Sequence, residues 1–314
     1  MTVTEKVLKR FFLNLKKRYW YFKPYYHYKD ILLDLKKTIK KRKKGTQVFI
    51  LFSPQDEKIL ALAKFVSSLF DKKVFGFDCG RIEYLIFSKS SEKNFKEKFI
   101  KEILKENKEK QFIDIGIDAR DISLTKILKK IGFQEIKKHR FYYKKLASNF
   151  KKNLGKKGIL VRLKKKEDLP ILKRLAGVSF VCSRFYWDRN FKRKAVKKFY
   201  ERWLLNSFKD EKSHRLFVAT LNKQIVGFLD CKILKINKRK IGIIDLLAVD
   251  KHHQGKGVGK YLLITGFNYF QKRKIKEVYA ETEEDNLAAQ KLYESLGMKI
   301  IALKRSFHFW NEKR

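Results

Sequence analysis

The segment LLAVDKHHQGKGVGKYLL, residues 246–263, constrains the fold more than any other part of the chain. Its apolar start is typical of a buried strand that ends at Val249, and its last part is typical of a helix that follows the glycines. Glycines in such a turn let successive backbone N–H groups point at one anion, and the helix N-terminus adds its dipole. The spacing matches neither a P-loop nor the GxGxxG dinucleotide fingerprint. We therefore predict a strand, a pyrophosphate-binding turn and a helix.

A second segment, EVYAETEEDNLAAQKLYESLGM at residues 277–298, indicates a strand, a helix opened by Asn286 and a glycine that ends the helix. Together the two segments resemble the GNAT superfamily of acetyl-CoA-dependent N-acetyltransferases. The signature of that superfamily, Q/R-x-x-G-x-G/A, is met by Gln254, Gly257 and Gly259. The resemblance covers about residues 158–310.

The resemblance implies a twisted sheet that splays between the strand ending at Val249 and the strand starting near Glu277. Acetyl-CoA would be the co-substrate, and no metal is implied. Pantetheine would lie in the splay, the turn amides would hold the pyrophosphate, and strand N–H groups would stabilise negative charge on the acetyl oxygen. The implied cofactor-binding residues are Leu247, Val249, Gln254, Gly255, Lys256, Gly257, Val258, Gly259, Lys260 and Asn286.

Tyr293 matches the general acid of the superfamily, which protonates the departing thiolate of coenzyme A. A phenol with a pKa near 10 is protonated at pH 7 and can donate, so the residue type suits the role. The alternative is a core tyrosine on an amphipathic helix, because Leu292 and Leu296 flank it.

Asp245, four residues before Val249, stands where several members of the superfamily keep a carboxylate base. We expect it to take the proton of the acceptor amine, directly or through water. The alternatives are a satisfied strand carboxylate at this position, or Glu281 or Glu283 as the base.

The two halves of the chain resemble each other when one slides by 165 residues. FIDIGIDARDISLTKILKKIGF, residues 112–133, then aligns with residues 277–298, which favours a tandem duplication. Leu128 stands opposite Tyr293 and Asp121 opposite Asn286, so the first copy is expected to be degenerate. The predicted fold class is therefore α/β, with tandem GNAT-like domains that are each a twisted mixed β-sheet flanked by helices.

Three segments organise the predicted chain. Residues 1–45 form a basic aromatic segment, residues 46–150 a degenerate GNAT-like α/β domain and residues 158–314 the catalytic domain. In the first domain we expect a strand over residues 48–52, then a helix over residues 56–70 with Ser53 as N-cap and Pro54 as its first residue.

Residues 182–208 combine an arginine with several aromatics and resemble nucleotide-aminosugar N-acetyltransferases such as TDP-fucosamine acetyltransferases. In that group the region lies beside the acceptor pocket. The resemblance implies that Arg184 meets the sugar-nucleotide phosphates and that Tyr186 or Trp187 stacks on base or sugar. Alternatively, these side chains pack the helix against the sheet.

The chain has a formal net charge of +44, with 77 Lys and Arg against 33 Asp and Glu. Such a charge attracts nucleic acid, anionic membrane or phosphate-bearing small molecules, but it is spread along the chain and first of all indicates a basic surface. A 44% share of hydrophobic residues excludes a disordered polycation. Three distant cysteines and the lack of a membrane-length apolar run favour a cytoplasmic protein.

Three hypotheses follow. The first is acetyl transfer to a nucleotide-linked amino sugar, and the second is acetyl transfer to a protein or another small amine. The third is an RNA- or membrane-tethered protein that binds through the interleaved bases and aromatics of residues 1–45, which could otherwise pack as an amphipathic helix.

Overall fold

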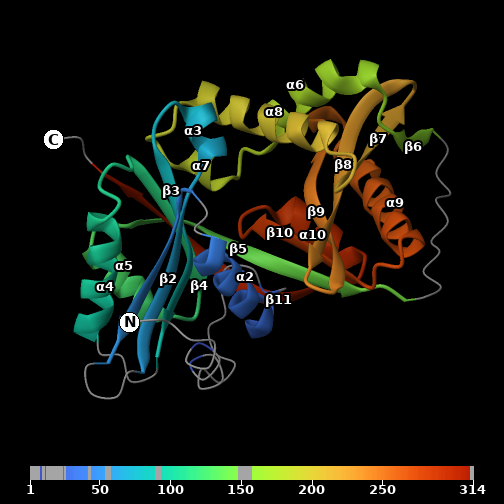
Figure 1. The fold of residues 1–314 in the computed structure, drawn as a ribbon. Coiled ribbons are helices and arrows are strands. Elements are labelled where there is room, and N and C mark those ends of the chain that lie inside the picture. The colour runs from blue at the N-terminus through green and yellow to red at the C-terminus, as the bar shows by residue number, and fades with distance from the viewer. Residues whose placement is uncertain are drawn as a thin grey trace. The chain divides into compact units, whose positions relative to one another are not determined.

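The computed structural model describes residues 8, 11, 24, 26–41, 44–53, 58–88, 93–147 and 158–311. Its contacts divide the chain into two compact units, which consist of residues 1–138 with 303–314 and of residues 139–302. The divisions fall within strands β5 (Gln134–Lys145) and β11 (Lys299–Trp310) (Figure 1). Most of the predicted aromatic segment, including Tyr19, Trp20 and Tyr25, lies outside the described residues, as does the whole stretch between the two predicted domains, residues 151–157.

The first unit is a mixed sheet with helices on both faces. Its strands lie in the order β1-β2-β3-β4-β11, antiparallel except for the parallel pair β3 and β4. The elements are α2 (Tyr28–Lys41), β1 (Thr46–Phe52), β2 (Ile59–Ser67), α3 (Leu69–Phe75), β3 (Cys79–Phe87), α4 (Lys93–Lys105), β4 (Phe112–Asp118) and α5 (Ile122–Lys130). One core cluster joins the sheet to α4 and α5, and another joins it to α2.

The predicted helix over residues 56–70 is wrong, because Ile59–Ser67 form strand β2, paired antiparallel with β1. Leu62 packs in the cluster with α2, whereas Phe65 packs in the cluster with α4. A strand that is buried on both faces has a continuous apolar run rather than an alternating one, and such a run can also be taken for a helix. Pro54 lies outside the described residues.

The second unit is the twisted mixed sheet that the sequence predicts. Its strands lie in the order β6-β7-β8-β9-β10-β5, antiparallel except for the parallel pair β9 and β10. The elements are β6 (Ile159–Leu163), α6 (Leu169–Ser179), α7 (Arg184–Trp187), α8 (Arg193–Lys209), β7 (His214–Leu221), β8 (Gln224–Ile236), β9 (Arg239–Val249), α9 (Val258–Lys272), β10 (Glu277–Glu283) and α10 (Leu287–Ser295).

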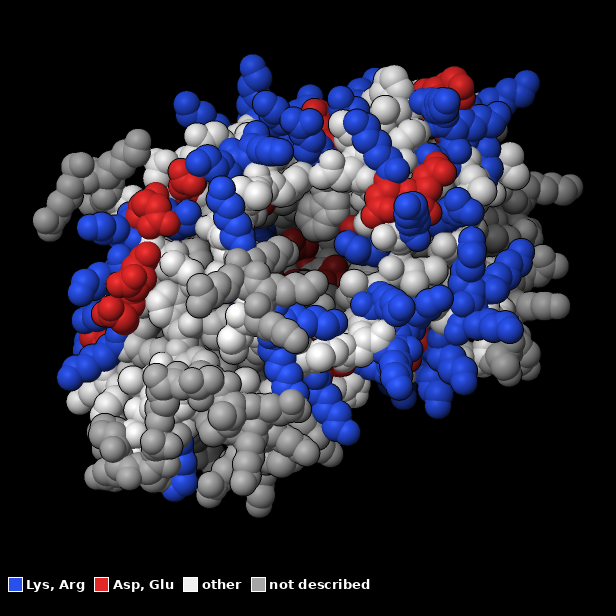
Figure 2. All heavy atoms as spheres, viewed as in Figure 1, with Lys and Arg blue, Asp and Glu red and all other residues white. Residues whose placement is uncertain are grey.

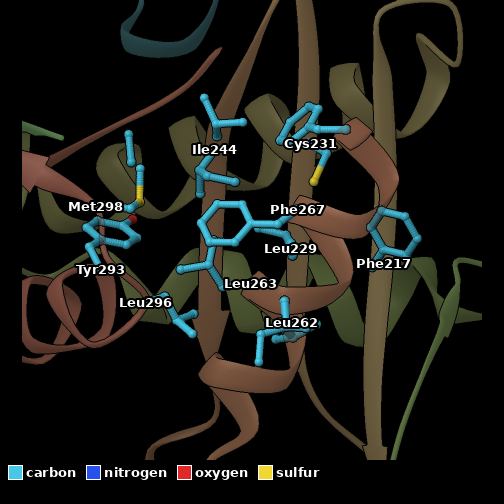
Figure 3. Packing of buried hydrophobic residues seen from close by; sticks show 14 of the residues in the cluster. Phe217, Leu229, Cys231, Ile244, Leu262, Leu263, Phe267, Tyr293, Leu296 and Met298 are labelled. Atoms are coloured by element: carbon cyan, nitrogen blue, oxygen red, sulfur yellow. The ribbon is translucent and has the colours of Figure 1, made fainter. Parts of the chain in front are cut away.

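Helix α9 covers one face of this sheet, and its apolar side chains pack with those of the strands in the core of the second unit (Figure 3). A Cβ at Gly266 would lie 2.7 Å from Leu229 Cδ2, so the close approach of helix and strand needs a glycine there. Because side chains alternate along a strand, Leu229 and Cys231 face α9 while Asp230 between them faces the other side. Helices α6 and α8 pack on that other side.

The internal repeat of 165 residues is confirmed. Strand β4 and helix α5 correspond to β10 and α10, and β5 corresponds to β11, with the same offset at both ends of each element. The helix caps also correspond: Asp121 accepts the N–H of Leu124 at 2.9 Å, and Asn286 accepts the N–H of Ala289 at 3.2 Å.

The two repeats exchange their last strands. In β5, residues 139–145 pair with Glu277–Glu283 of β10 in the second unit. In β11, residues 304–310 pair with Phe112–Asp118 of β4 in the first unit. Each compact unit therefore contains a strand from the other half of the sequence, whereas the predicted domains 46–150 and 158–314 would each keep their own.

This exchange predicts how the chain responds to truncation. A chain that begins at residue 158 loses β5, so β10 becomes an exposed edge strand and the chain is expected to aggregate or to unfold at lower urea concentration. A matched chain that begins at residue 134 keeps β5. Size-exclusion chromatography and urea unfolding followed by circular dichroism compare the two, and equal stability would contradict the expectation.

Candidate active site

The two parallel strands of the second unit diverge. Within the described residues, β9 and β10 are paired only from Gly242↔Val278 to Ile244↔Ala280. The end of β9, which includes Leu247 and Val249, therefore continues without β10 beside it. An unpaired strand edge presents backbone N–H and C=O groups that can bind an extended ligand.

Asp245 lies at a β-bulge where this divergence begins. Asp230 of β8 opposes Leu246 and the next residue, Cys231, opposes Ile244, so Asp245 is the extra residue of β9. A bulge bends its strand and turns the side chain of the extra residue. The irregularity thus coincides with the candidate base.

The glycine-rich turn has the conformation that anion binding requires. Gly255 and Gly257 have φ angles of +76° and +86°, and Gly257 is the N-cap of α9. The Tyr261 N–H donates to Gly257 O, so the three preceding amides, Val258, Gly259 and Lys260, have no acceptor within the helix. Such unpaired amides, together with the helix dipole, can bind an anion.

Other residues of the turn hold it in place. Gln254 Nε2 donates to Val249 O at 3.2 Å and ties the turn back to the end of β9. A Cβ at Gly259 would lie 3.1 Å from Leu292 Cδ2, so this glycine lets α9 approach α10 closely. Lys256 and Lys260 are exposed beside the turn and can neutralise a bound anion.

Tyr293 lies on α10, buried at the edge of the core cluster beside Met298 (Figure 3). Its ring centroid is 5.2 Å from that of Tyr142 of β5, whose hydroxyl donates to Glu294 Oε1 at 2.8 Å. Burial, followed by the charge of Glu283 and by Tyr142, raises the pKa of Tyr293 above 10. The phenol is therefore protonated at neutral pH and can donate a proton. Both predicted roles, core residue and acid, fit this position.

Asp245 belongs to a cluster of polar side chains on the α8 side of the sheet. Trp203 of α8 donates from Nε1 to Asp245 Oδ2 at 2.9 Å. His214 Nδ1 lies 2.9 and 3.0 Å from the two oxygens of Asp230. One side-chain nitrogen or oxygen from each of His214, Asp230 and Asp245 lies within 4.8 Å of the other two.

The alternative bases lie on β10. Glu281 Oε1 is 3.1 Å from Nδ1 of His139, a buried residue of β5. Glu283 acts electrostatically on Tyr293 and on the buried Tyr200, whose pKa is raised by burial first and then by Glu283. Carboxylates therefore approach the divergence from both of its strands.

The short helix α7 carries the three predicted substrate residues. Arg184 stacks with its guanidinium carbon 4.3 Å from the centre of the Phe185 ring. The guanidinium carbon of Arg193 lies 3.8 Å from the centre of the Tyr186 ring, whereas Trp187 is 57% exposed. Behind them, Tyr200 stacks between Phe180 and Trp203. Arg184 and Tyr186 thus pack against neighbouring side chains, whereas most of Trp187 is exposed.

Asn286 is the N-cap of α10, and its side-chain oxygen accepts a hydrogen bond from the Ala289 N–H. This is a structural task, and it does not itself indicate contact with a cofactor.

The basic surface is dispersed. Lys and Arg side chains are scattered with some acids between them over the face in Figure 2. Among the helices that the structure describes, none has the length and apolar character to cross a bilayer.

Sequence reasoning missed His214, Asp230, Trp203 and Tyr142. His214, Asp230 and Trp203 come from β7, β8 and α8, and they meet through strand pairing and helix packing, which no local spacing in the sequence reports. One signal was present: Asp230 interrupts the apolar run IVGFLDCKIL, and a fully buried carboxylate needs a partner.

Comparison with known proteins matches residues 181–298 to the acetyltransferase (GNAT) family. The spore coat polysaccharide biosynthesis protein SpsD of Bacillus subtilis is 27% identical over 146 residues, which is 46% of this chain and 49% of that protein. N-alpha-acetyltransferase 30 of Xenopus laevis is 35% identical over 96 residues, which is 30% of this chain and 34% of that protein. The chain thus aligns with half or less of the length of these relatives.

Among solved structures, a tandem GNAT protein from the clavulanic acid biosynthesis pathway superimposes with a TM-score of 0.61 at 10% identity. The alignment covers 99% of this chain and 96% of that one. The predicted tandem fold is therefore confirmed.

The turn gives a stability prediction. Gly257→Ala places a Cβ at a φ of +86° and is expected to destabilise the chain by about 1–2 kcal/mol, the cost of a left-handed conformation. Lys256→Ala, at an exposed neighbour, is the control and should change stability by less than about 0.5 kcal/mol. Urea unfolding measures both, and equal effects would show that the turn is not strained.

Proposed function

We propose that this chain transfers the acetyl group of acetyl-CoA to a primary amine, because residues 181–298 match the acetyltransferase (GNAT) family. Catalysis is assigned to the predicted domain 158–314, together with residues 139–145 of β5, which complete its sheet. The observation that carries the proposal is the divergence of β9 from β10 directly beside the glycine turn.

The residues present fit acetyl-CoA. The edge of β9 at Leu247 and Val249 suits an extended amide-bearing arm, and Val258, Gly259 and Lys260 direct unpaired helix amides at an anion. Acetyl-CoA supplies the activated acetyl thioester when it is bound. Gln254, Gly255, Lys256 and Gly257 shape or neutralise this site, and Asn286 fixes the start of the neighbouring helix.

Tyr293 is assigned as the acid. The phenol keeps its proton at neutral pH because burial raises its pKa, and Tyr293 lies on α10, the helix that packs against the glycine turn through Leu292 and Gly259. In this proposal it would donate that proton to the thiolate of coenzyme A. Neighbouring apolar residues exclude water, which strengthens hydrogen bonds made there.

Asp245 is assigned as the base. An ammonium acceptor must lose a proton before its nitrogen can attack, and a carboxylate can accept that proton directly or through one water. The Trp203 indole fixes one oxygen of Asp245, so the other is the candidate proton acceptor.

The acceptor is assigned as a nucleotide-linked amino sugar. SpsD supports this assignment by its name, which places that protein in polysaccharide biosynthesis. The exposed Trp187 can stack on a base or sugar, and Arg184 and the surrounding basic surface can attract its phosphates.

A protein N-terminus is the second candidate acceptor, because N-alpha-acetyltransferase 30 is more identical to this chain than SpsD over a shorter length. The first test incubates the full chain with acetyl-CoA and a panel of TDP- and UDP-amino sugars, peptides and polyamines while thiol release is followed. Release with an amino sugar supports the lead, and release with peptides alone would overturn it. Release with no amine would reject the proposed activity.

Tyr293→Phe is expected to lower kcat about 100-fold with little change in the KM for acetyl-CoA, because the proton donor is lost while the ring is kept. Tyr142→Phe is the matched control, since it removes the hydroxyl of the adjacent ring without touching the acid. Steady-state kinetics on both variants decide the assignment. Unchanged turnover in Tyr293→Phe would make this residue a core tyrosine.

A further inference from the structure

The polar cluster of His214, Asp230 and Asp245 brings two carboxylates close to one histidine. Asp230 is fully buried, and Asp245 is a second carboxylate within 4.8 Å of the same histidine. Burial of a single charge is costly, and two neighbouring carboxylates cannot both ionise cheaply without a cation. His214 is the basic group between them.

The geometry indicates which nitrogen of His214 carries a proton. Both oxygens of Asp230 lie within 3.0 Å of His214 Nδ1, so this nitrogen carries a proton and donates it to the carboxylate. Burial disfavours the imidazolium, but the hydrogen bond and charge of Asp230, with the charge of Asp245, raise the pKa of His214 above its usual value. Burial and then Asp245 raise the pKa of Asp230.

The other elements packed on the cluster add few charges. The charge of Lys232 on β8 acts to lower the pKa of His214. Asp210, which follows α8, interacts electrostatically with His214. From α8, Trp203 and Ser207 face the carboxylates, and the buried residues of α6 are Leu172, Leu175 and Ala176. His214 is therefore the cation that is hydrogen-bonded within the cluster.

We infer that His214 and Asp230 are positioning residues for the catalytic base: a protonated His214 offsets the negative charge of the buried Asp230, so that Asp245 does not face an uncompensated second carboxylate. This inference rests on the proposed role of Asp245. The acceptor ammonium then gives one proton to the Asp245 carboxylate, leaving a neutral amine and a carboxylic acid. His214 keeps its proton throughout.

Two variants of similar shape should shift the pH dependence in opposite directions. His214→Gln keeps a donor for Asp230 but removes the charge, so the acidic limb of kcat/KM should move to higher pH by roughly one unit. Asp230→Asn removes the opposing negative charge, so the limb should move to lower pH. A merely structural role would lower activity in both variants and leave the limb unmoved, which would overturn the inference.

Asp245→Asn separates this inference from the proposed function. If Asp245→Asn is inactive while His214→Gln leaves the acidic limb in place, the charge-setting role fails alone. If Asp245→Asn has the turnover and limb of the parent chain, the base assignment fails and takes the inference with it.

A second measurement needs no turnover. In ¹⁵N-histidine NMR of the full chain, His214, assigned by the signal missing from His214→Gln, should titrate above about 6.5, the ordinary histidine pKa. The titration should fall to lower pH in Asp230→Asn. A neutral His214 at pH 6 would overturn the inference. So would one equivalent of Zn²⁺ bound after incubation with the metal alone and lost in His214→Gln, because the three groups would then be ligands.

Discussion

The proposed active site of the second unit depends on the point after Ile244 where the parallel pairing of β9 with β10 ends. Two strands that part must leave backbone groups of at least one of them unpaired, and such groups persist in a protein when solvent or a ligand can satisfy them. The bulge at Asp245 bends β9 at the same point. The glycine turn then begins where β9 ends, because Gln254 is tied to Val249. The free edge of β9, the proposed base Asp245 and the glycine turn thus all depend on the point at which β9 leaves β10.

The parts of this arrangement that could be predicted from sequence are those with a local signature. Residues 254–260 require positive φ angles at defined spacing, and Asn286 and Gly297 bound a helix of the expected length. The 165-residue offset predicted the repeat because each copy keeps the same order of strand, cap and helix. Each of these features depends on neighbours within a few residues.

The remainder depends on pairing between distant segments. The sequence predicts a helix where strand β2 forms, because the strand is largely apolar on both faces and lacks the alternation that distinguishes a strand from a helix. The meeting of His214, Asp230 and Asp245 depends on the register of three strands and on the placement of the bulge at Asp245. A slip of one residue would send Asp230 into the core beneath α9. The exchange of β5 and β11 depends on pairing with strands about 140 to 190 residues away in the sequence, which no local pattern reports.

That exchange has a consequence for the order in which the chain can fold during synthesis. Strand β4 leaves the ribosome long before residues 304–310, its antiparallel partner, so the first unit cannot complete its sheet from its own half of the sequence. Its edge stays open while the second repeat is made, and contacts so distant in sequence form slowly. The last strand to be synthesised closes the first unit, so a nascent chain of this protein is expected to need protection from aggregation until that strand arrives.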